Sequence, residues 1–229
     1  MTTKTPDFQQ WAATQQSRIE AQLQAVLPAA DIAPQRLHAA MRYAALGGGK
    51  RVRPLLAFAA GEVVVEASTG PKQVEELLAA ASGSRGMAGG QAIDLAATGK
   101  TLTLPELEFM HIHKTGAIIR ATTLLGARCG TPLEKKELER LDHFAKCIGL
   151  AFQVVDDVLD IEASTATLGK TAGKDAQHNK PTYVSLIGVA ESKKLAGELR
   201  ADALASLEVF GARALRLREL ADFIVLRKF

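Results

Sequence analysis

The sequence has little of several features that mark other classes of protein. Only two of its 229 residues are cysteines, Cys129 and Cys147, too few for a disulfide framework, so a reducing compartment is the simpler expectation. No window approaches the 18 apolar residues that a membrane span needs, and the polar, Gln-rich N-terminus is unlike a signal peptide. We therefore expect a soluble, cytoplasmic protein.

Aromatic residues and net charge are also scarce. Aromatics make up 5% of the chain, and 28 Lys and Arg against 25 Asp and Glu leave a net charge of +3. This charge is too small to indicate a nucleic-acid partner, and no basic stripe with interleaved aromatics is present. Apolar residues form 47% of the chain, mostly Ala, Leu and Val, with many Glu, Lys and Arg. This composition favours helices over sheets, so we predict an all-α, single-domain protein over residues 1–229.

Apolar spacing and helix-capping signals divide the chain into helices. Thr103 and Thr131 are each followed three residues later by Glu, the pattern of a capping box, so a helix is predicted to begin at each threonine. Residues 165–179 show no apolar period and are predicted to form a loop. The helices expected are 7–27, 34–46, 54–66, 103–125, 131–159, 181–190, 191–210 and 211–229.

Three aspartates gather on one predicted helix. Asp156, Asp157 and Asp160 share a face with Gln153, because residues three and four apart on a helix are neighbours. Their like charges repel, and no Lys or Arg lies between Lys146 and Lys170 to offset them. A divalent cation would relieve this repulsion, and carboxylate oxygens suit Mg²⁺. The alternative is an ordinary solvated acidic face.

Basic residues that could meet a phosphate lie in three separate segments. Lys50, Arg51 and Arg53 follow three glycines, which would let the backbone approach an anion closely. Lys114, next to Thr115, shares an apolar helix face and would need a partner if buried. Lys170, Lys174 and Lys180 lie in the predicted loop and could close over an anion. Each group could instead be solvated surface, and Lys114 could pair with a structural carboxylate.

Two further segments have structural rather than chemical interpretations. The glycines between Gly83 and Gln91 do not match a dinucleotide-binding pattern and predict close packing of helices, with Gln91 and Asp94 near a cavity. His111, His113 and His143 show no metal-binding spacing, so each is expected in the core or at the surface.

Taken in order, these motifs closely resemble the trans-isoprenyl diphosphate synthases, the polyprenyl synthase family, and especially the bacterial farnesyl and geranylgeranyl type. The resemblance runs almost end to end, and the ordered set is far more specific than any one motif. The matching segments are 48–54 (GGKRVRP), 90–95 (GQAIDL), 113–117 (HKTGA), 152–160 (FQVVDDVLD), 169–175 (GKTAGKD) and 180–183 (KPTY).

The resemblance implies a helical bundle around a central cavity, a homodimer, and a Mg²⁺-dependent condensation of isopentenyl diphosphate with an allylic diphosphate. The expected product is farnesyl diphosphate; a geranylgeranyl or longer-chain synthase, a non-catalytic subunit of a heteromeric synthase and a ligand-free helical module remain alternatives. The implied ligands are Lys50, Arg51 and Arg53 for isopentenyl diphosphate, Lys114, Gln153, Lys170 and Lys180 for the allylic diphosphate, Thr115 beside the reacting carbon, and Asp156, Asp157 and Asp160 for the metal.

One departure from the family is large. The family has two aspartate-rich motifs that face each other across the cavity, and this sequence shows only the second. The first would lie between about residues 66 and 73, where only a short linking stretch is present. We predict that a segment is missing there, and the residues that set product length are missing with it. Either this sequence omits a stretch that the protein has, or the chain carries a genuine deletion and is inactive; the intact remaining motifs favour the first.

Overall fold

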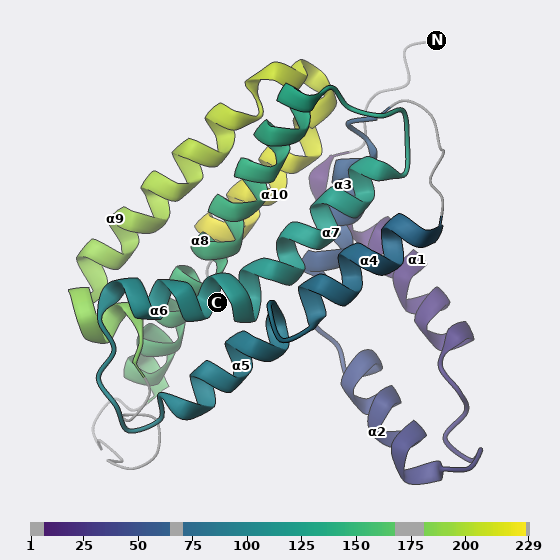
Figure 1. Ribbon diagram of the computed structural model, residues 1–229, viewed down its shortest axis with the longest axis horizontal. Coiled ribbons are helices and arrows are strands. Elements are labelled where there is room, and N and C mark those ends of the chain that lie inside the picture. Colours follow the sequence, from purple (N-terminus) through teal and green to yellow (C-terminus); the bar gives the residue numbers. More distant parts are fainter. Residues whose placement is uncertain (1–6, 65–70, 168–180, 228–229) are drawn as a thin grey trace.

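The computed structural model describes residues 7–64, 71–167 and 181–227, and these residues form helices with no strand among them (Figure 1). The predicted all-α class is therefore confirmed. Within this part of the chain, no helix is both long and apolar enough to cross a membrane. The elements are α1 (Phe8–Val26), α2 (Gln35–Leu46), α3 (Val52–Gly61), α4 (Pro71–Ser82), α5 (Met87–Ala96), α6 (Leu104–His111), the π-helical turn η1 (Ile112–Gly116), α7 (Ala117–Arg128), α8 (Lys135–Thr167), α9 (Tyr183–Ser206), the 3₁₀ segment η2 (Glu208–Ala214) and α10 (Leu215–Leu226).

The two predicted capping signals had different outcomes. Thr103 caps α6 as expected, and its backbone N–H donates to Glu106 Oε2 at 2.8 Å. The start predicted at Thr131 is wrong, because α8 begins at Lys135. There the backbone N–H of Glu134 donates to Glu137 Oε2 at 3.2 Å. The same three-residue reach is used one turn later, from Glu134 to Glu137 instead of from Thr131 to Glu134.

The helix predicted over 103–125 is interrupted by η1. The backbone widens into a π-helical turn at Ile112–Gly116, between α6 and α7. π-Helical turns inserted into α-helices are rare overall, but those that occur are often found at functional sites. The turn carries Lys114 and Thr115, two of the residues singled out by the sequence.

The long helix α8 connects the two halves of the hydrophobic core. Phe144 and Ile148, in its first half, pack with buried residues of α3 and α10. Val154 and Leu159, in its second half, pack with buried residues of α6 and α9. Helix α9 returns antiparallel alongside α8 (Figure 1). The buried residues of α8 thus fix the orientation of the helix, including the part that carries its aspartates.

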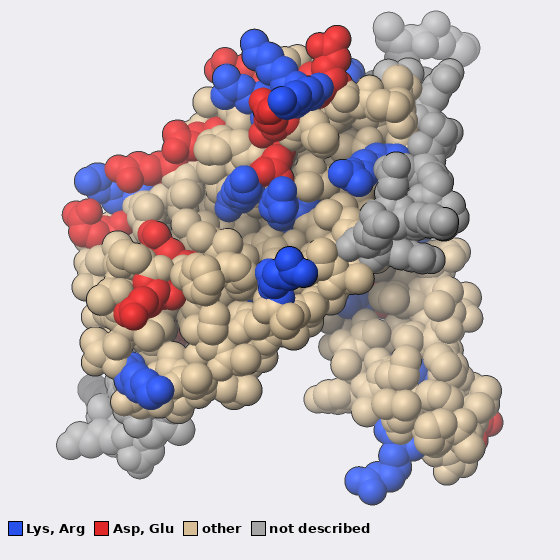
Figure 2. Space-filling view, in the orientation of Figure 1, with Lys and Arg blue, Asp and Glu red and all other residues tan. Residues whose placement is uncertain are grey.

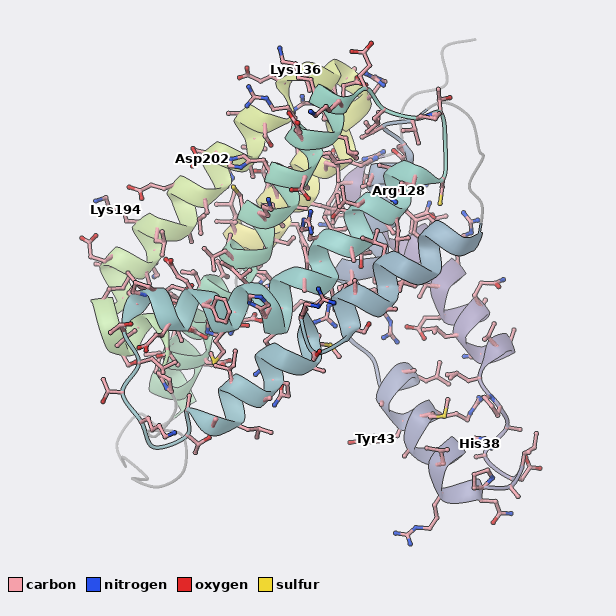
Figure 3. All side chains as sticks on the ribbon, viewed as in Figure 1. His38, Tyr43, Arg128, Lys136, Lys194 and Asp202 are labelled. Carbon is pink, nitrogen blue, oxygen red and sulfur yellow. The ribbon has the colours of Figure 1, made fainter. Side chains whose placement is uncertain are left out.

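Helices α1 and α2 form an arm that projects from this body (Figure 1). Helix α2 has no buried residue, and Tyr43 is 84% exposed. His38 and Tyr43 lie on the arm away from the rest of the chain (Figure 3), and the visible surface of the arm is largely uncharged (Figure 2). Exposed apolar residues on such a surface indicate a face that is normally covered, and nothing in the described ranges covers it.

Helices α3 and α7 cross at a close backbone contact. A Cβ added at Gly126 of α7 would lie 2.0 Å from the carbonyl oxygen of Ala57 in α3. Real side-chain atoms do not approach a backbone oxygen so closely, so the crossing requires glycine at this position. By contrast, a Cβ added at Gly197, inside α9, would meet nothing within 4 Å.

We predict that Gly126→Ala lowers the free energy of unfolding by at least about 1–3 kcal/mol, because the added methyl forces α3 and α7 apart. Gly197→Ala is the matched control and should raise it by about 0.5–1 kcal/mol, as alanine is the better helix former. Urea denaturation of both variants measures the difference. Equal stabilities would show that the crossing is not tight.

Candidate functional site

The three aspartates of α8 have three different environments. Asp156 is half-buried, Asp157 is buried at 6% exposure, and Asp160 is exposed. Each residue of an α-helix is turned by about 100° from the one before it. Asp156 and Asp160, four residues apart, therefore point the same way, whereas Asp157 is turned toward α9. The sequence predicted a single shared face for all three.

Asp156 is bound by an arginine from the C-terminal end of the described chain. The guanidinium of Arg227 forms an ion pair with Asp156 Oδ1 and lies over the ring of Phe152, 4.4 Å from its centroid. Its side chain is only 3% exposed. Burial lowers the pKa of Arg227, and Asp156 acts in the opposite direction. The aspartate therefore already has a buried cation beside it.

The charge state of Asp156 reflects several neighbours. Burial raises the pKa of its carboxyl, and repulsion from Asp160 adds to this, whereas Arg227 and Lys50 lower it. Lys50 thus lies within electrostatic range of Asp156, although 106 residues separate them in the sequence. The fold brings one of the predicted phosphate-binding cations to the acidic helix, as the sequence interpretation requires.

Asp157 is engaged by the protein on both carboxylate oxygens. Its Oδ2 accepts from the backbone N–H of Tyr183 at 2.9 Å, and its Oδ1 accepts from Gln153 Nε2 at 2.9 Å. Burial raises the pKa of Asp157 to about 6, and its two hydrogen bonds act against that rise. Gln153 in turn accepts from the Thr115 hydroxyl at 3.2 Å. Two residues expected to meet substrate are therefore held by protein groups.

Lys114 lies beside a buried carboxylate rather than beside the aspartates of α8. Its Nζ is 2.7 Å from Oδ2 of Asp94, a residue of α5 that is 5% exposed. The two elements touch closely, since a Cβ added at Gly90 would lie 2.1 Å from the backbone nitrogen of Lys114. The predicted close packing around Gly83–Gln91 is confirmed at this contact.

The glycine-rich basic segment forms a strained turn that leads into α3. Gly48 and Gly49 have φ of 91° and 134°, and Arg51 adopts the left-handed conformation at φ 52°. The Arg51 guanidinium is 2.5 Å from Glu20 of α1, so this arginine ties α3 to the arm. Arg53 is exposed. The predicted ligands Lys170 and Lys180 lie outside the described residues, as does most of the loop predicted over 165–179.

The structure also reveals a buried polar pair next to Lys114 that the sequence left undecided. His111 is 4% exposed and stacks on Tyr183, which is fully buried, with 5.6 Å between ring centroids. Neither imidazole nitrogen, nor the Tyr183 hydroxyl, has a hydrogen-bond partner among the described residues. Burial, followed by the positive charge of Lys114, lowers the pKa of His111 to about 4, and burial raises that of Tyr183.

Arg227 is the one residue of this arrangement that the sequence interpretation missed. Its partner Asp156 lies 71 positions away, and an arginine near the end of a helix carries no local signal of such a contact. Asp94 was expected near a cavity, but its pairing with Lys114 was not specified. A pocket of about 420 Å³ elsewhere in the molecule is lined by Ile112, Ala117 and Leu150, not by the aspartates of α8.

The acidic face of α8 supplies only some of the ligands that a metal ion needs. Among the described residues, no group of three His, Cys, Asp or Glu converges as a metal-binding cluster. Mg²⁺, however, keeps several waters and is commonly held by one or two carboxylates together with substrate phosphates. Asp156 and Asp160 fit that requirement, although Arg227 already pairs with Asp156 and would compete with a metal ion for it.

Comparison with known proteins places this chain in a family. The profile of the family described as polyprenyl synthetase matches residues 65–204. Farnesyl diphosphate synthase of Escherichia coli K12 is 48% identical over 153 residues, which cover 66% of this chain and 51% of that enzyme. Geranylgeranyl pyrophosphate synthase 4 of Arabidopsis thaliana is 33% identical over 294 residues, covering 96% and 78%. The crystal structure of a farnesyl/geranylfarnesyl diphosphate (FPP/GFPP) synthase from Zymomonas mobilis superposes with a TM-score of 0.81 at 28% identity, covering 95% and 99%.

The lengths of these matches show that the relatives hold residues that this chain lacks. The chain spans about half of the E. coli enzyme. The Arabidopsis match counts 294 positions although only about 220 residues of this chain take part, so some 70 positions face a gap. The E. coli match is nearly free of gaps, since its 153 positions use about 151 residues of this chain. The gaps agree with a segment missing near residues 66–73, which stays a prediction, and the family match begins at residue 65.

We predict that His111 makes the protein sensitive to acid. The unfolded chain takes up a proton near pH 6.5 and the folded chain only near pH 4, so stability is intact above pH 6.5 and is lost as pH falls between these values. The loss should approach about 3 kcal/mol at pH 4. The free energy of unfolding of wild type and His111→Phe, compared from pH 7 to 4.5, isolates this effect, because other titrating groups are common to both.

The exposed His38 serves as the matched control. His38→Phe should follow the wild-type pH curve. Parallel curves for wild type and His111→Phe would show that the buried imidazole does not resist protonation.

Proposed function

The chain belongs to the polyprenyl synthetase family, and from that premise we propose that it condenses isopentenyl diphosphate with dimethylallyl or geranyl diphosphate and releases pyrophosphate. The observation that carries the proposal is the shared orientation of Asp156 and Asp160, one turn apart on α8, with Asp156 within electrostatic range of Lys50. The 48% identity to a farnesyl diphosphate synthase favours farnesyl diphosphate as the product. A geranylgeranyl product is the alternative within the same chemistry.

Asp156 and Asp160 are the residues that would hold Mg²⁺. When bound there, the metal would neutralise the charge that builds on the departing pyrophosphate. Hard carboxylate oxygens on one helix, one turn apart, are the donors that this cation prefers. Burial removes part of the water around the Asp156 carboxylate, so this group needs a positive partner whenever it is ionised.

The remaining residues supply cations and exclude water. Lys50 and Arg53 would hold isopentenyl diphosphate, and Lys114, with Lys170 and Lys180 from outside the described residues, would hold the allylic diphosphate. Lys114 would have to share its charge between Asp94 and substrate. Val155, Val158 and Leu159 bury apolar surface beside the aspartates. Such a dry surface protects an allylic cation from water until the double bond of isopentenyl diphosphate attacks it.

Quaternary structure and location form part of the same proposal. A homodimer is expected from the family, and the apolar residues exposed on α2 are available for an additional contact. Cys129 and Cys147 are unpaired thiols, which supports a reducing, cytoplasmic setting.

A second function has a specific observation in its favour. The missing internal segment would contain the first aspartate-rich motif, so the chain could serve as a non-catalytic subunit beside a complete synthase. The two functions differ in what the chain does alone. Only the first gives Mg²⁺-dependent turnover without a partner.

The direct test is pyrophosphate release from isopentenyl diphosphate and geranyl diphosphate with Mg²⁺. We expect release by the chain, and a loss of at least about 100-fold in kcat for Asp156→Asn, which removes charge at the metal. Asp222→Asn, a partly exposed aspartate paired with Arg200, is the matched control and should keep its rate. Absence of turnover with or without a family partner would end the enzyme proposal, and turnover only with the partner would favour the subunit role.

We also predict that Arg227 competes with the metal for Asp156. Arg227→Gln removes the buried cation beside this carboxylate, so Mg²⁺ should bind about tenfold more tightly, a change of about 1.4 kcal/mol. Isothermal titration with MgCl₂ measures this without substrate. Arg200→Gln, which removes an arginine paired with Asp222, should leave the affinity unaltered. Equal or weaker binding in Arg227→Gln would contradict the competition.

A further inference from the structure

Asp157 is positioned to act on α9 rather than on a ligand. Tyr183 is the first residue of α9, and its backbone N–H is one of the donors that a helix start leaves without an intrahelical partner. Asp157 Oδ2 accepts from this N–H at 2.9 Å across 26 residues of sequence. A carboxylate at this end of a helix is also favoured by the helix dipole. Asp157 of α8 therefore caps a different helix, immediately after the undescribed residues 168–180.

The second oxygen of Asp157 continues into a chain of hydrogen bonds. Gln153 Nε2 donates to Asp157 Oδ1 at 2.9 Å, and Gln153 Oε1 accepts from the Thr115 hydroxyl at 3.2 Å. Thr115 and Asp157 are each 6% exposed, so these bonds lie in the interior. Both ends of the Gln153 amide are thus fixed, one by a donor and one by an acceptor. This series of hydrogen bonds joins η1, α8 and the start of α9.

The neighbours of Asp157 set it apart from the other two aspartates. Asp156 faces Arg227 and Lys50, and Asp160 is exposed. Each oxygen of Asp157 already accepts one hydrogen bond from the protein, and the residue is only 6% exposed. A hydrated metal ion would have to open this packing, and breaking either bond would leave a buried donor without a partner, which is costly where no water replaces it.

We propose that Asp157 is a positioning residue and not a metal ligand. Together with Gln153 and Thr115 it fixes the spacing between η1, which carries Lys114, the acidic face of α8, and the first turn of α9. This inference rests on the proposed function for its catalytic meaning, but the hydrogen-bonded chain itself does not depend on it. It revises the expectation that all three aspartates bind Mg²⁺.

Substitution of each aspartate separates the two roles. In the full chain, Asp157→Asn should keep its Mg²⁺ affinity within about twofold of wild type, whereas Asp156→Asn and Asp160→Asn should each lose about tenfold or more. Asparagine can still accept from Tyr183 N–H, and Gln153 can turn its amide to meet the new NH₂ group. A loss of Mg²⁺ affinity in Asp157→Asn equal to that in Asp156→Asn would overturn the proposal.

Hydrogen exchange tests the tether directly. The amide of Tyr183 should exchange at least about tenfold faster in Asp157→Ala than in wild type, because its acceptor is gone, and Asp157→Asn should restore the protection. Asp160→Ala is the matched control and should leave this amide unaffected. Equal protection in wild type and Asp157→Ala would overturn the tether. Should Asp157→Ala not fold, Asp157→Leu, which also removes the acceptor but leaves less empty space, replaces it in the same comparison.

Turnover provides the third readout. At saturating Mg²⁺, Asp157→Ala should lower kcat with little change in Mg²⁺ affinity, and Asp157→Asn should recover most of the rate, a pattern that a lost ligand would not give. If neither wild type nor any variant binds Mg²⁺ or turns over, the proposed function fails, while the exchange of Tyr183 still confirms or overturns the tether by itself.

Discussion

The structure depends on how one helix accommodates ionised carboxylates next to its own buried stripe. Helix α8 packs along most of its length, so Asp156 and Asp157 cannot turn freely to water, and each must find positive charge or hydrogen-bond donors nearby. Asp156 is paired with Arg227 and lies within electrostatic range of Lys50, Asp157 accepts from the amides of Tyr183 and Gln153, and Asp160 is exposed to solvent. The chemistry proposed for the site follows from the first and third of these solutions.

An internal segment missing near residues 66–73, as predicted from the sequence, would explain why only one aspartate-rich helix is present. Some 70 positions of a family relative have no counterpart here, yet the helices on either side still reproduce the family fold. The exposed apolar residues of α2 and the absence of a converging acidic cluster among the described residues are both expected if part of the bundle is absent. The aspartates of α8 have counter-ions and hydrogen-bond donors from the rest of the protein. Helix α8 therefore does not need a second aspartate-rich helix to hold them in place.

The sequence predicted the parts of this account that depend on local pattern. The apolar periodicity of α8, the cap at Thr103 and the capacity of Asp156 and Asp160 to share a face all follow from spacing along one helix. Three features could not be predicted in this way. The π-helical turn at Ile112–Gly116, the ion pair between Asp156 and Arg227, and the bond from Tyr183 to Asp157 depend on how distant helices meet. A 100° turn between neighbouring residues then decides which aspartate faces which partner.

The central claim is that Asp156 and Asp160, but not Asp157, form the cation-binding face of α8. Anomalous X-ray scattering from crystals grown with Mn²⁺ and pyrophosphate measures this most directly, because manganese can replace magnesium at oxygen sites and is located by its own signal. We predict anomalous density beside the carboxylates of Asp156 and Asp160, with Arg227 displaced and the Asp157–Tyr183 bond retained. Density bound to Asp157, or none along this face of α8, would contradict the account.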